Sequence, residues 1–209
     1  MLDSPSLIVR PMSKQDIPGA VALQRSCFPE PFPAELLWSY HHLERHLEIF
    51  PEGQFVALHG GLVIGSASAL LISEESWLAH NDWETTTGGH FLSAHDPNGS
   101  TLYAADISVH PEYRGQGVGR MLYEARFELV RRFAIERLGT ACRIPDFAAW
   151  HAKVGGTVQD YALAVAQNEI RDRTLTPLLR YGLKLLGILE DYMDDEESAN
   201  AAALLEWKP

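Results

Sequence analysis

The sequence has little positive charge and few cysteines, and each shortage argues against a class of protein. Its 17 lysines and arginines stand against 28 aspartates and glutamates, a formal net charge of −11 over 209 residues. A general nucleic-acid-binding protein carries an excess of lysine and arginine on one face, although a local basic pocket for a small anion remains compatible with this composition. The two cysteines, Cys27 and Cys142, have neither zinc-site nor disulfide spacing, which favours reduced thiols in a cytoplasmic protein.

Long apolar runs are also missing. No uninterrupted apolar stretch is long enough to cross a bilayer, and the segment MLDSPSLIVRPMSKQD lacks the basic start and apolar run of a signal peptide. We therefore expect no membrane association. With 46% hydrophobic residues the chain is long enough for one sizeable core, and we expect a single domain over residues 1–209.

Hydrophobic spacing and turn residues predict an α/β mixture around one sheet, without an internal repeat. Ser13 is a candidate N-cap, and Gly60-Gly61 is a hairpin signal between two strands. The segment 73–100 is long, polar and rich in turn formers, and we predict a functional loop there. The other predicted elements are a strand over 7–10, helices over 13–28 and 34–50, a strand over 101–109, a helix over 117–138 capped by Gly139, a strand over 140–144, mostly helix over 146–182 and a final strand pair.

The stretch DISVHPEYRGQGVGRMLYEARFELVRRF, residues 106–133, has glycines and arginines where a strand is followed by a helix. Unpaired N–H groups and the dipole at a helix N-terminus attract an anion, and glycines let the backbone approach it closely. Arg114 and Arg120 flank the turn and can pair with phosphate. We therefore predict that a pyrophosphate binds the amides of residues 116–120.

Two familiar glycine motifs do not fit this turn. YRGQGVGR lacks the Gly-Lys-Ser/Thr ending of a Walker A sequence, and its glycines are spaced G-x-G-x-G, unlike the dinucleotide fingerprint. The pattern R-x-x-G-x-G at Arg114, Gly117 and Gly119, preceded by ISVHPEY, closely resembles the acetyl-CoA-binding motif of the GNAT superfamily of N-acetyltransferases. The alternative is a helix start that merely needs glycines.

The resemblance extends over nearly the whole chain. Residues 95–126, CRIPDF and the ending EDYMDDEESANAAALLEW resemble the acetyltransferase-like module often fused to a carbon–nitrogen hydrolase (nitrilase-like) domain. This implies a GNAT fold, with a single mixed, mostly antiparallel central sheet flanked by helices. It also implies acetyl-CoA as the acyl donor, and we expect no metal.

The resemblance also implies where the donor binds. The backbone of Ile107, Ser108 and Val109 would pair with the pantetheine arm. Tyr123 and Arg126 would lie near the adenosine end, or else belong to an ordinary helix surface. The pyrophosphate would bind the turn formed by Arg114, Gly115, Gln116, Gly117, Val118, Gly119 and Arg120.

Attack of an amine on a thioester requires a base for the ammonium and a donor for the carbonyl oxygen. The superfamily often has a glutamate on the central strand, and Tyr103 occupies that position here. Asp106 is the only acid on this strand, and is either the base or structural. Because strand side chains alternate, we expect Asp106 to face opposite Tyr103, Ala105 and Ile107.

An acid can then protonate the departing thiolate. The superfamily's usual tyrosine, four residues before a Gly-Phe turn, corresponds to Leu178 if that turn is Gly182-Leu183. The nearest replacements are Tyr181 and Tyr192, and we take Tyr181 as the candidate. Some superfamily members need no acid, since the thiolate of coenzyme A is a tolerable leaving group.

Acceptor-site candidates lie outside the turn. Trp83 and His95 belong to the segment 73–100, which could overhang the acceptor, but HDPNG around His95 is also ordinary turn chemistry, which we favour. Arg143, in CRIP, either binds a substrate carboxylate or is structural.

Two further groups of residues have more ordinary interpretations. His41, His42 and His46 lack the spacing of a metalloprotease motif, and we predict a solvated helix face. The acidic run 190–197 could steer a cationic amine, but we favour a solvated, charge-protected hairpin edge.

The resemblance implies an N-acetyltransferase that moves an acetyl group from acetyl-CoA to a primary amine by direct attack in a ternary complex, and we expect it to be cytoplasmic. One alternative is a module without turnover that senses acyl-CoA or docks a partner, and another is an acyltransferase for longer acyl chains. A homodimer is common for this fold, although no interface is evident in the sequence. The acceptor amine is not predicted, because specificity lies in the loops.

Overall fold

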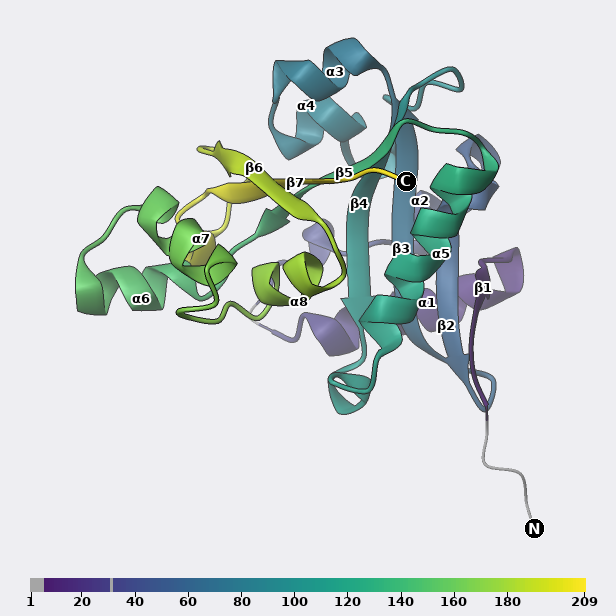
Figure 1. Ribbon diagram of the computed structural model, residues 1–209. Helices are drawn as coiled ribbons and strands as arrows, with labels where there is room; N and C mark the ends of the chain where they lie inside the picture. Colours follow the sequence, from purple (N-terminus) through teal and green to yellow (C-terminus); the bar gives the residue numbers. More distant parts are fainter. Residues whose placement is uncertain (1–5, 31) are drawn as a thin grey trace.

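The computed structural model describes residues 6–30 and 32–209 (Figure 1). Within them a seven-stranded sheet has the order β1-β2-β3-β4-β5-β7-β6. Neighbouring strands are antiparallel except β4 and β5, which are parallel. The predicted mixed, mostly antiparallel sheet is therefore confirmed. The strands are β1 (Leu7–Pro11), β2 (Gln54–His59), β3 (Leu62–Ile72), β4 (Thr101–Val109), β5 (Arg137–Arg143), β6 (Lys184–Leu189) and β7 (Ala202–Trp207).

Helices cover both faces of the sheet, and each face has its own core (Figure 1). Helix α1 packs on β3 and β4 from one side, and its apolar residues share a core with Tyr103. Helix α5 packs on the other side, where Val118 and Leu122 join a second core. The helices are α1 (Ile17–Cys27), α2 (Tyr40–Ile49), α3 (Glu74–Ala79), α4 (Trp83–Thr87), α5 (Val118–Arg132), α6 (Phe147–Val154), α7 (Val158–Ala166) and α8 (Leu175–Arg180).

Strand β4 contains one extra residue, a β-bulge. Ser68 pairs with Asp106 and Ala69 pairs with Ala104, so that Ala105 is left without a partner. A bulge interrupts the alternation of side chains. Asp106 therefore lies on the same face as Tyr103 and Ala105, toward α1. Our prediction that Asp106 faces opposite those two residues is wrong for this reason, although Ile107 does pack against the opposite core.

Strands β4 and β5 pair only at their beginnings. The register joins Thr101–Tyr103 to Arg137–Gly139, after which β4 continues beside β3 and β5 beside β7. The His110 N–H donates to Ile64 O at 2.9 Å, and alternate backbone groups of an antiparallel strand point to opposite sides. The N–H groups of Ile107 and Val109 therefore point away from β3, toward the side where β5 has separated.

Several predicted boundaries differ from the structure. The helix expected over 34–50 is divided into a 3₁₀ turn and α2, because Ser39 caps α2 by accepting from the His42 N–H at 3.2 Å. Residues 73–100 contain α3 and α4 rather than an irregular loop. Gly139 lies in β5 and is not a helix cap; a Cβ there would lie 2.4 Å from the Trp77 ring. None of the described helices is both long and apolar enough to span a membrane.

Candidate functional site

The turn before α5 has the backbone that an anion site requires. Gly115 and Gly117 have φ angles of +74° and +88°, which favour glycine. A Cβ at either position would meet no atom within 4 Å, so the backbone conformation and not the available space explains these glycines. Gly117 is the N-cap of α5, and no side chain caps the helix there. The first N–H groups of α5 are therefore suited to bind an anion.

Polar side chains hold this turn against the end of β4. Arg114 Nε donates to Val109 O at 3.1 Å, and Gln116 Nε2 donates to Glu112 O at 2.8 Å. Arg120 pairs with Glu124 at 2.8 Å along the exposed side of α5. Both arginines are exposed, and each uses only Nε in these hydrogen bonds, which leaves the terminal guanidinium nitrogens for a phosphate.

Tyr181, which follows α8, contacts the beginning of α5. A Cβ at Gly119 would lie 3.4 Å from the Tyr181 hydroxyl oxygen, and the Tyr181 ring packs on Tyr123 with centroids 5.6 Å apart. Burial raises the pKa of Tyr181. The phenol is therefore protonated at neutral pH, as a proton donor must be. Tyr181 lies beside the glycine turn, whereas Tyr192 does not.

Tyr123 and Arg126 point into the protein. Tyr123 is 2% exposed and Arg126 is 0% exposed, because both lie on the side of α5 that packs against the sheet. The prediction that they lie near an adenosine, or on an ordinary helix surface, is therefore wrong.

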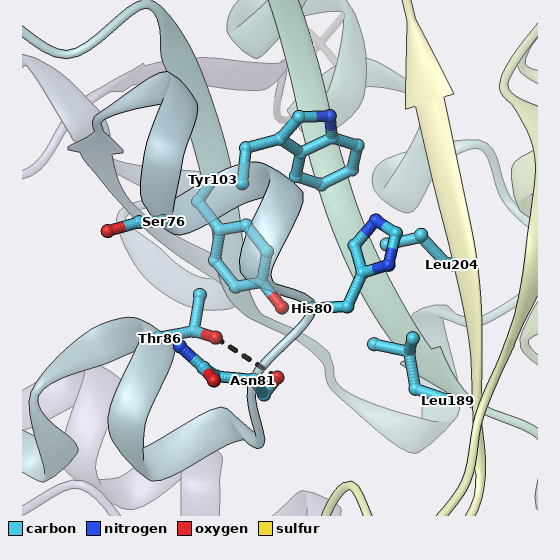
Figure 2. A pocket seen from close by; sticks show the side chains of 8 residues that line it. Ser76, His80, Asn81, Thr86, Tyr103, Leu189 and Leu204 are labelled. Carbon is cyan, nitrogen blue, oxygen red and sulfur yellow. Dashed lines mark hydrogen bonds between the residues drawn. The ribbon is translucent and has the colours of Figure 1, made fainter.

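Tyr103 is poorly suited to accept a proton. Its hydroxyl is hydrogen-bonded to that of Tyr192, and burial raises the pKa of Tyr103 to about 12. Figure 2 shows Tyr103 beside a cavity of about 10 Å³ that is also lined by His80 and Thr86. Such a cavity holds about one water molecule and no acceptor. The structure therefore does not support Tyr103 as a catalytic residue.

Asp106 lies half-buried on the α1 side of β4. Gln24 Nε2 is 3.4 Å from its Oδ2 and 2.9 Å from Ser108 Oγ. Burial raises the pKa of Asp106, against the lowering effects of Trp38, the Arg126 charge and Gln24. A carboxylate with a raised pKa is a stronger base, and its pKa lies nearer to neutral pH, where it can take a proton from an ammonium group. Asp106 therefore remains the candidate base.

Two tryptophans lie close to Asp106. Trp83 Nε1 donates to Ala105 O at 3.2 Å, and the ring is 6.0 Å from that of Trp38. The predicted Trp83 is thus brought next to the bulge, whereas the sequence reasoning missed Gln24 and Trp38. Gln24 interrupts the buried apolar stripe of α1, a signal that could have identified it.

His95 lies away from this cluster. Its Nδ1 accepts from the Leu71 N–H at 3.1 Å, and its ring stacks on Phe50 at 4.9 Å. Leu71 pairs with Leu102, at the opposite end of β4 from the glycine turn. The Gly99 N–H donates to Asp96 O at 2.9 Å, which confirms the predicted turn. His95 holds this turn against β3 and does not lie at the binding site of the acceptor amine.

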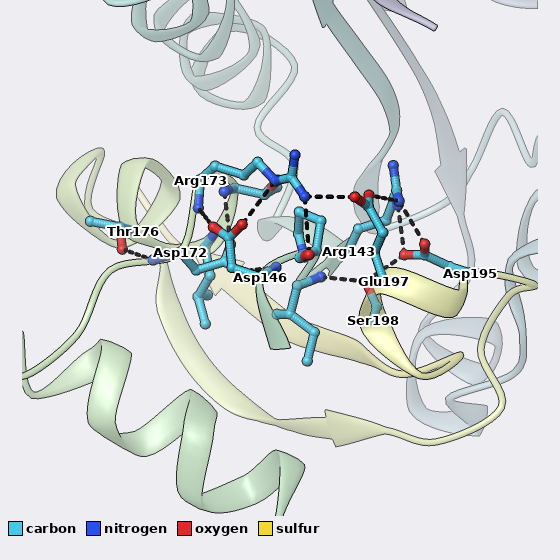
Figure 3. A network of polar contacts seen from close by, with 12 residues as sticks. Arg143, Asp146, Asp172, Arg173, Thr176, Asp195, Glu197 and Ser198 are labelled. Atoms are coloured by element: carbon cyan, nitrogen blue, oxygen red, sulfur yellow. Dashed lines mark hydrogen bonds and ion pairs between the residues drawn. The ribbon is translucent and has the colours of Figure 1, made fainter. Parts of the chain in front are cut away.

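Arg143 is engaged within the protein. Its Nε and one terminal nitrogen each bind Asp195 at 2.6 Å, and the same nitrogen binds Glu197 at 3.0 Å (Figure 3). Arg173 also pairs with Glu197, at 2.8 Å. The structure favours the structural role of Arg143. Because Asp195 and Glu197 are paired, the acidic run 190–197 is not simply a solvated edge.

The predicted solvated face of α2 holds for His41, which is exposed, but is wrong for His46. His46 is 1% exposed and its Nε2 donates to His90 O at 2.7 Å, which leaves Nδ1 buried without a partner. Burial lowers the pKa of His46 to about 4. Across residues 6–30 and 32–209, no group of three or more His, Cys, Asp or Glu side chains is arranged to hold a metal.

Similar proteins identify the family of the chain. The model of the acetyltransferase (GNAT) family matches residues 17–152. The chain is also 37% identical over 203 residues to the uncharacterized N-acetyltransferase YkwB of Bacillus subtilis (strain 168), covering 97% of this chain and 89% of that protein. The chain belongs to the GNAT acetyltransferase family. The predicted resemblance to this superfamily is thereby confirmed.

Other similar proteins differ from this chain in length or in the activity that their names give. The probable hydrolase YhcX of B. subtilis (strain 168) is 35% identical over 202 residues, covering 96% of this chain but only 38% of that protein. The structure of the GNAT-like decarboxylase GphF with isobutyryl-CoA is 26% identical, with a TM-score of 0.79 and coverage of 96% and 98%. The loading GNATL domain of CurA from Lyngbya majuscula, 17% identical with a TM-score of 0.81 and coverage of 97% and 98%, shows the shared fold.

Proposed function

We propose that this GNAT protein transfers an acetyl group from acetyl-CoA to a primary amine. The observation that carries this proposal is the uncapped N-terminus of α5 at Gly117, directly after the part of β4 from which β5 has separated. One continuous path thus leads from an anion-binding turn to the backbone of Ile107 and Val109. A cofactor with a pyrophosphate and an extended amide-containing arm suits both parts of this path.

The residues along this path have complementary roles. The amides of residues 116–120, with Arg114 and Gly115, bind the pyrophosphate, while Ile107 and Val109 pair with the pantetheine arm. The Val109 carbonyl already accepts from Arg114 Nε, so the N–H of Val109 and the backbone of Ile107 make this contact. The backbone of Ser108 points to β3 instead, so the expectation that it also pairs with the arm is wrong. The thioester then lies near the bulge at Ala105, within the region of Asp106.

The chemistry requires proton transfers at the amine and at the thiolate. Asp106 takes a proton from the ammonium group of the acceptor, directly or through water, and the neutral amine attacks the thioester carbonyl. The C–N bond forms, the C–S bond breaks, and the thiolate receives a proton from Tyr181. The amide nitrogen loses its second proton through water to the Tyr181 phenolate, and Asp106 releases its proton to solvent. Trp38 and Trp83 supply apolar surface for the carbon skeleton of the amine, and a carboxylate beside them favours a cationic acceptor.

The first test is thermal unfolding of the wild type, Gly119→Ala and Gly119→Glu, each with and without acetyl-CoA. A ligand at a hundred times its Kd adds about 2.7 kcal/mol to the free energy of unfolding. We expect wild type and Gly119→Ala to be stabilised, since a Cβ has room beside Tyr181. Gly119→Glu loses this stabilisation because its carboxylate repels the pyrophosphate. No stabilisation of the wild type at millimolar acetyl-CoA contradicts the proposal.

Turnover distinguishes the enzyme from a module that only binds acyl-CoA. Release of free coenzyme A in the presence of a panel of primary amines supports acyl transfer. Stabilisation by acetyl-CoA without release by any amine supports the sensing or docking role instead. A parallel series with isobutyryl-CoA shows whether a longer acyl chain is preferred.

The similarity to GphF favours decarboxylation as a second candidate function. A decarboxylase would take an acyl-CoA whose acyl group carries a free carboxylate, release CO₂ and place a proton on the remaining carbon. The Asp106 carboxylate opposes this reaction, because it would repel the carboxylate of the acyl group. Incubation with malonyl-CoA separates the two: CO₂ and acetyl-CoA indicate decarboxylation, whereas amine-dependent release of coenzyme A indicates transfer.

A further inference from the structure

Arg126 of α5 is an arginine without exposed surface. Its Nη2 donates to Ser68 O at 2.8 Å and also to Asp106 O. The other guanidinium nitrogens, Nε and Nη1, are buried and have no hydrogen-bond partner. Burial of a guanidinium group is costly unless it is paired, so this cation requires a compensating interaction.

The two carbonyl groups that Arg126 binds flank the bulge of β4. Ser68 and Asp106 are cross-strand partners, and the unpaired Ala105 directly precedes Asp106. A single guanidinium nitrogen therefore joins β3 and β4 where their ladder is interrupted. Arg126 approaches from the α5 side, whereas the Asp106 side chain points toward α1. It thus holds the backbone conformation that decides the direction of Asp106.

The charges on the two sides of β4 complement each other. Burial lowers the pKa of Arg126, and Tyr123 and Asp106 oppose this effect. Burial raises the pKa of Asp106. Three side chains lower it: Trp38 from the segment before α2, Arg126 from α5 and Gln24 from α1. Cys27, from the end of α1, is a further titratable neighbour of Asp106. In this group of side chains Arg126 supplies the cation and Asp106 the carboxylate.

We propose that Arg126 is a positioning residue for acyl transfer, which fixes the β4 bulge and balances the charge of the Asp106 carboxylate. This inference rests on the proposed function, in which Asp106 takes the proton of the amine. Lysine cannot substitute fully, because a compact ammonium on a flexible stem lacks the planar fork of a guanidinium group.

The direct test measures the titration of Asp106 by carbon-13 NMR of the aspartate carboxyl groups, with the signal assigned by its loss in Asp106→Asn. Arg126→Met removes the cation and keeps an apolar stem. The loss of a nearby positive charge should raise the pKa of Asp106 by about 1 unit. Arg126→Lys keeps a charge and should leave the titration close to that of the wild type. Arg132→Met, an exposed change at the end of α5, is the matched control.

Kinetics then separate positioning from a purely structural effect. In Arg126→Met, the acidic limb of the pH profile of kcat should move to higher pH by the same amount as the Asp106 titration. The Kd of acetyl-CoA should not change, because Arg126 lies away from the glycine turn. In Arg126→Lys, kcat should fall at every pH while the limb keeps its position, because a lysine does not hold both carbonyls. Arg132→Met should change neither property.

Three results overturn the inference: an Asp106 titration in Arg126→Met equal to that of the wild type, an unmoved acidic limb in that variant, or a wild-type kcat in Arg126→Lys. If Arg126→Met does not fold, kcat of Arg126→Lys and the acidic limb of its pH profile still decide whether Arg126 is a positioning residue. If the wild type releases no coenzyme A with any amine, the proposed function fails. The NMR titrations of the two variants then still decide whether Arg126 balances Asp106.

Discussion

The hydroxyl groups of Tyr103 and Tyr192 are hydrogen-bonded to each other in the core, although 89 residues separate them in the chain. Tyr103 lies on the central strand β4, and Tyr192 lies between β6 and β7. The backbone carbonyl of Tyr192 also accepts from the Trp83 N–H at 3.1 Å. This loop therefore connects the central strand with the beginning of α4, and so with the tryptophan that lies beside the bulge.

Removing one hydroxyl of this pair should destabilise the protein without stopping acyl transfer. Tyr103→Phe leaves the buried Tyr192 hydroxyl unpaired, at a cost of about 1–3 kcal/mol in the free energy of unfolding. The double variant Tyr103→Phe/Tyr192→Phe should cost less than the sum of the single changes, because no hydroxyl remains unpaired. Urea unfolding measures both. A folded Tyr103→Phe without amine-dependent release of coenzyme A would show that Tyr103 is needed for the chemistry.

Tyr181→Phe should lower kcat while leaving the Kd of acetyl-CoA unchanged. General acid catalysis contributes about 10²–10⁴-fold to a rate, and a thiolate needs less help than a poorer leaving group, so we expect a fall of about tenfold. Steady-state release of coenzyme A and a thermal shift with acetyl-CoA measure the two quantities. Tyr40→Phe, an exposed change on α2, is the control. An unchanged kcat would mean that the thiolate leaves without an acid from Tyr181.

His46 should make the stability of the protein depend on pH between about 4 and 6.5. Burial lowers the pKa of His46 to about 4, whereas an unfolded histidine titrates near 6.5. Neutral His46 thus makes its full contribution to the free energy of unfolding above pH 6.5. As the pH falls toward 4, this contribution is lost, and the free energy of unfolding decreases by about 3 kcal/mol. His46→Gln, which stays neutral, should lose less stability over this range. His41→Gln, exposed on the same helix, should behave as the wild type; equal slopes in all three proteins would contradict the assignment.

Arg143→Ala should destabilise the fold and leave the KM for the acceptor unchanged. Its partner carboxylate, Asp195, has a side chain only 6% exposed and would be left unpaired. Burial tends to raise the pKa of Asp195, and hydrogen bonds from Arg143 and Ser198 outweigh this effect and keep the pKa below its usual value.

We expect a loss of about 2 kcal/mol in urea unfolding, less than for a fully buried pair because Arg143 is partly exposed. Arg45→Ala, which breaks the exposed pair with Glu48, should cost less than about 1 kcal/mol. If Arg143→Ala is as stable as the wild type and its KM for the acceptor is raised, Arg143 binds the acceptor and is not structural.

Local features of this protein follow from the sequence. The predicted strand over 101–109 is β4, and the turn after it contains Gly115 and Gly117 at positive φ, followed by α5. A positive φ, an uncapped helix N-terminus and an alternating strand each depend on a few consecutive residues. For that reason the candidate anion site could be predicted, and the family with it.

The arrangement of the side chains around that turn was decided only by the tertiary structure. One extra residue in β4, Ala105, turns Asp106 to the α1 face, and this depends on the register with β3. The pairing of Tyr103 with Tyr192 and of Arg143 with Asp195 joins segments far apart in the chain. Such contacts arise when burial brings polar groups together and each must find a partner there, and no local pattern of residues records which partner it finds.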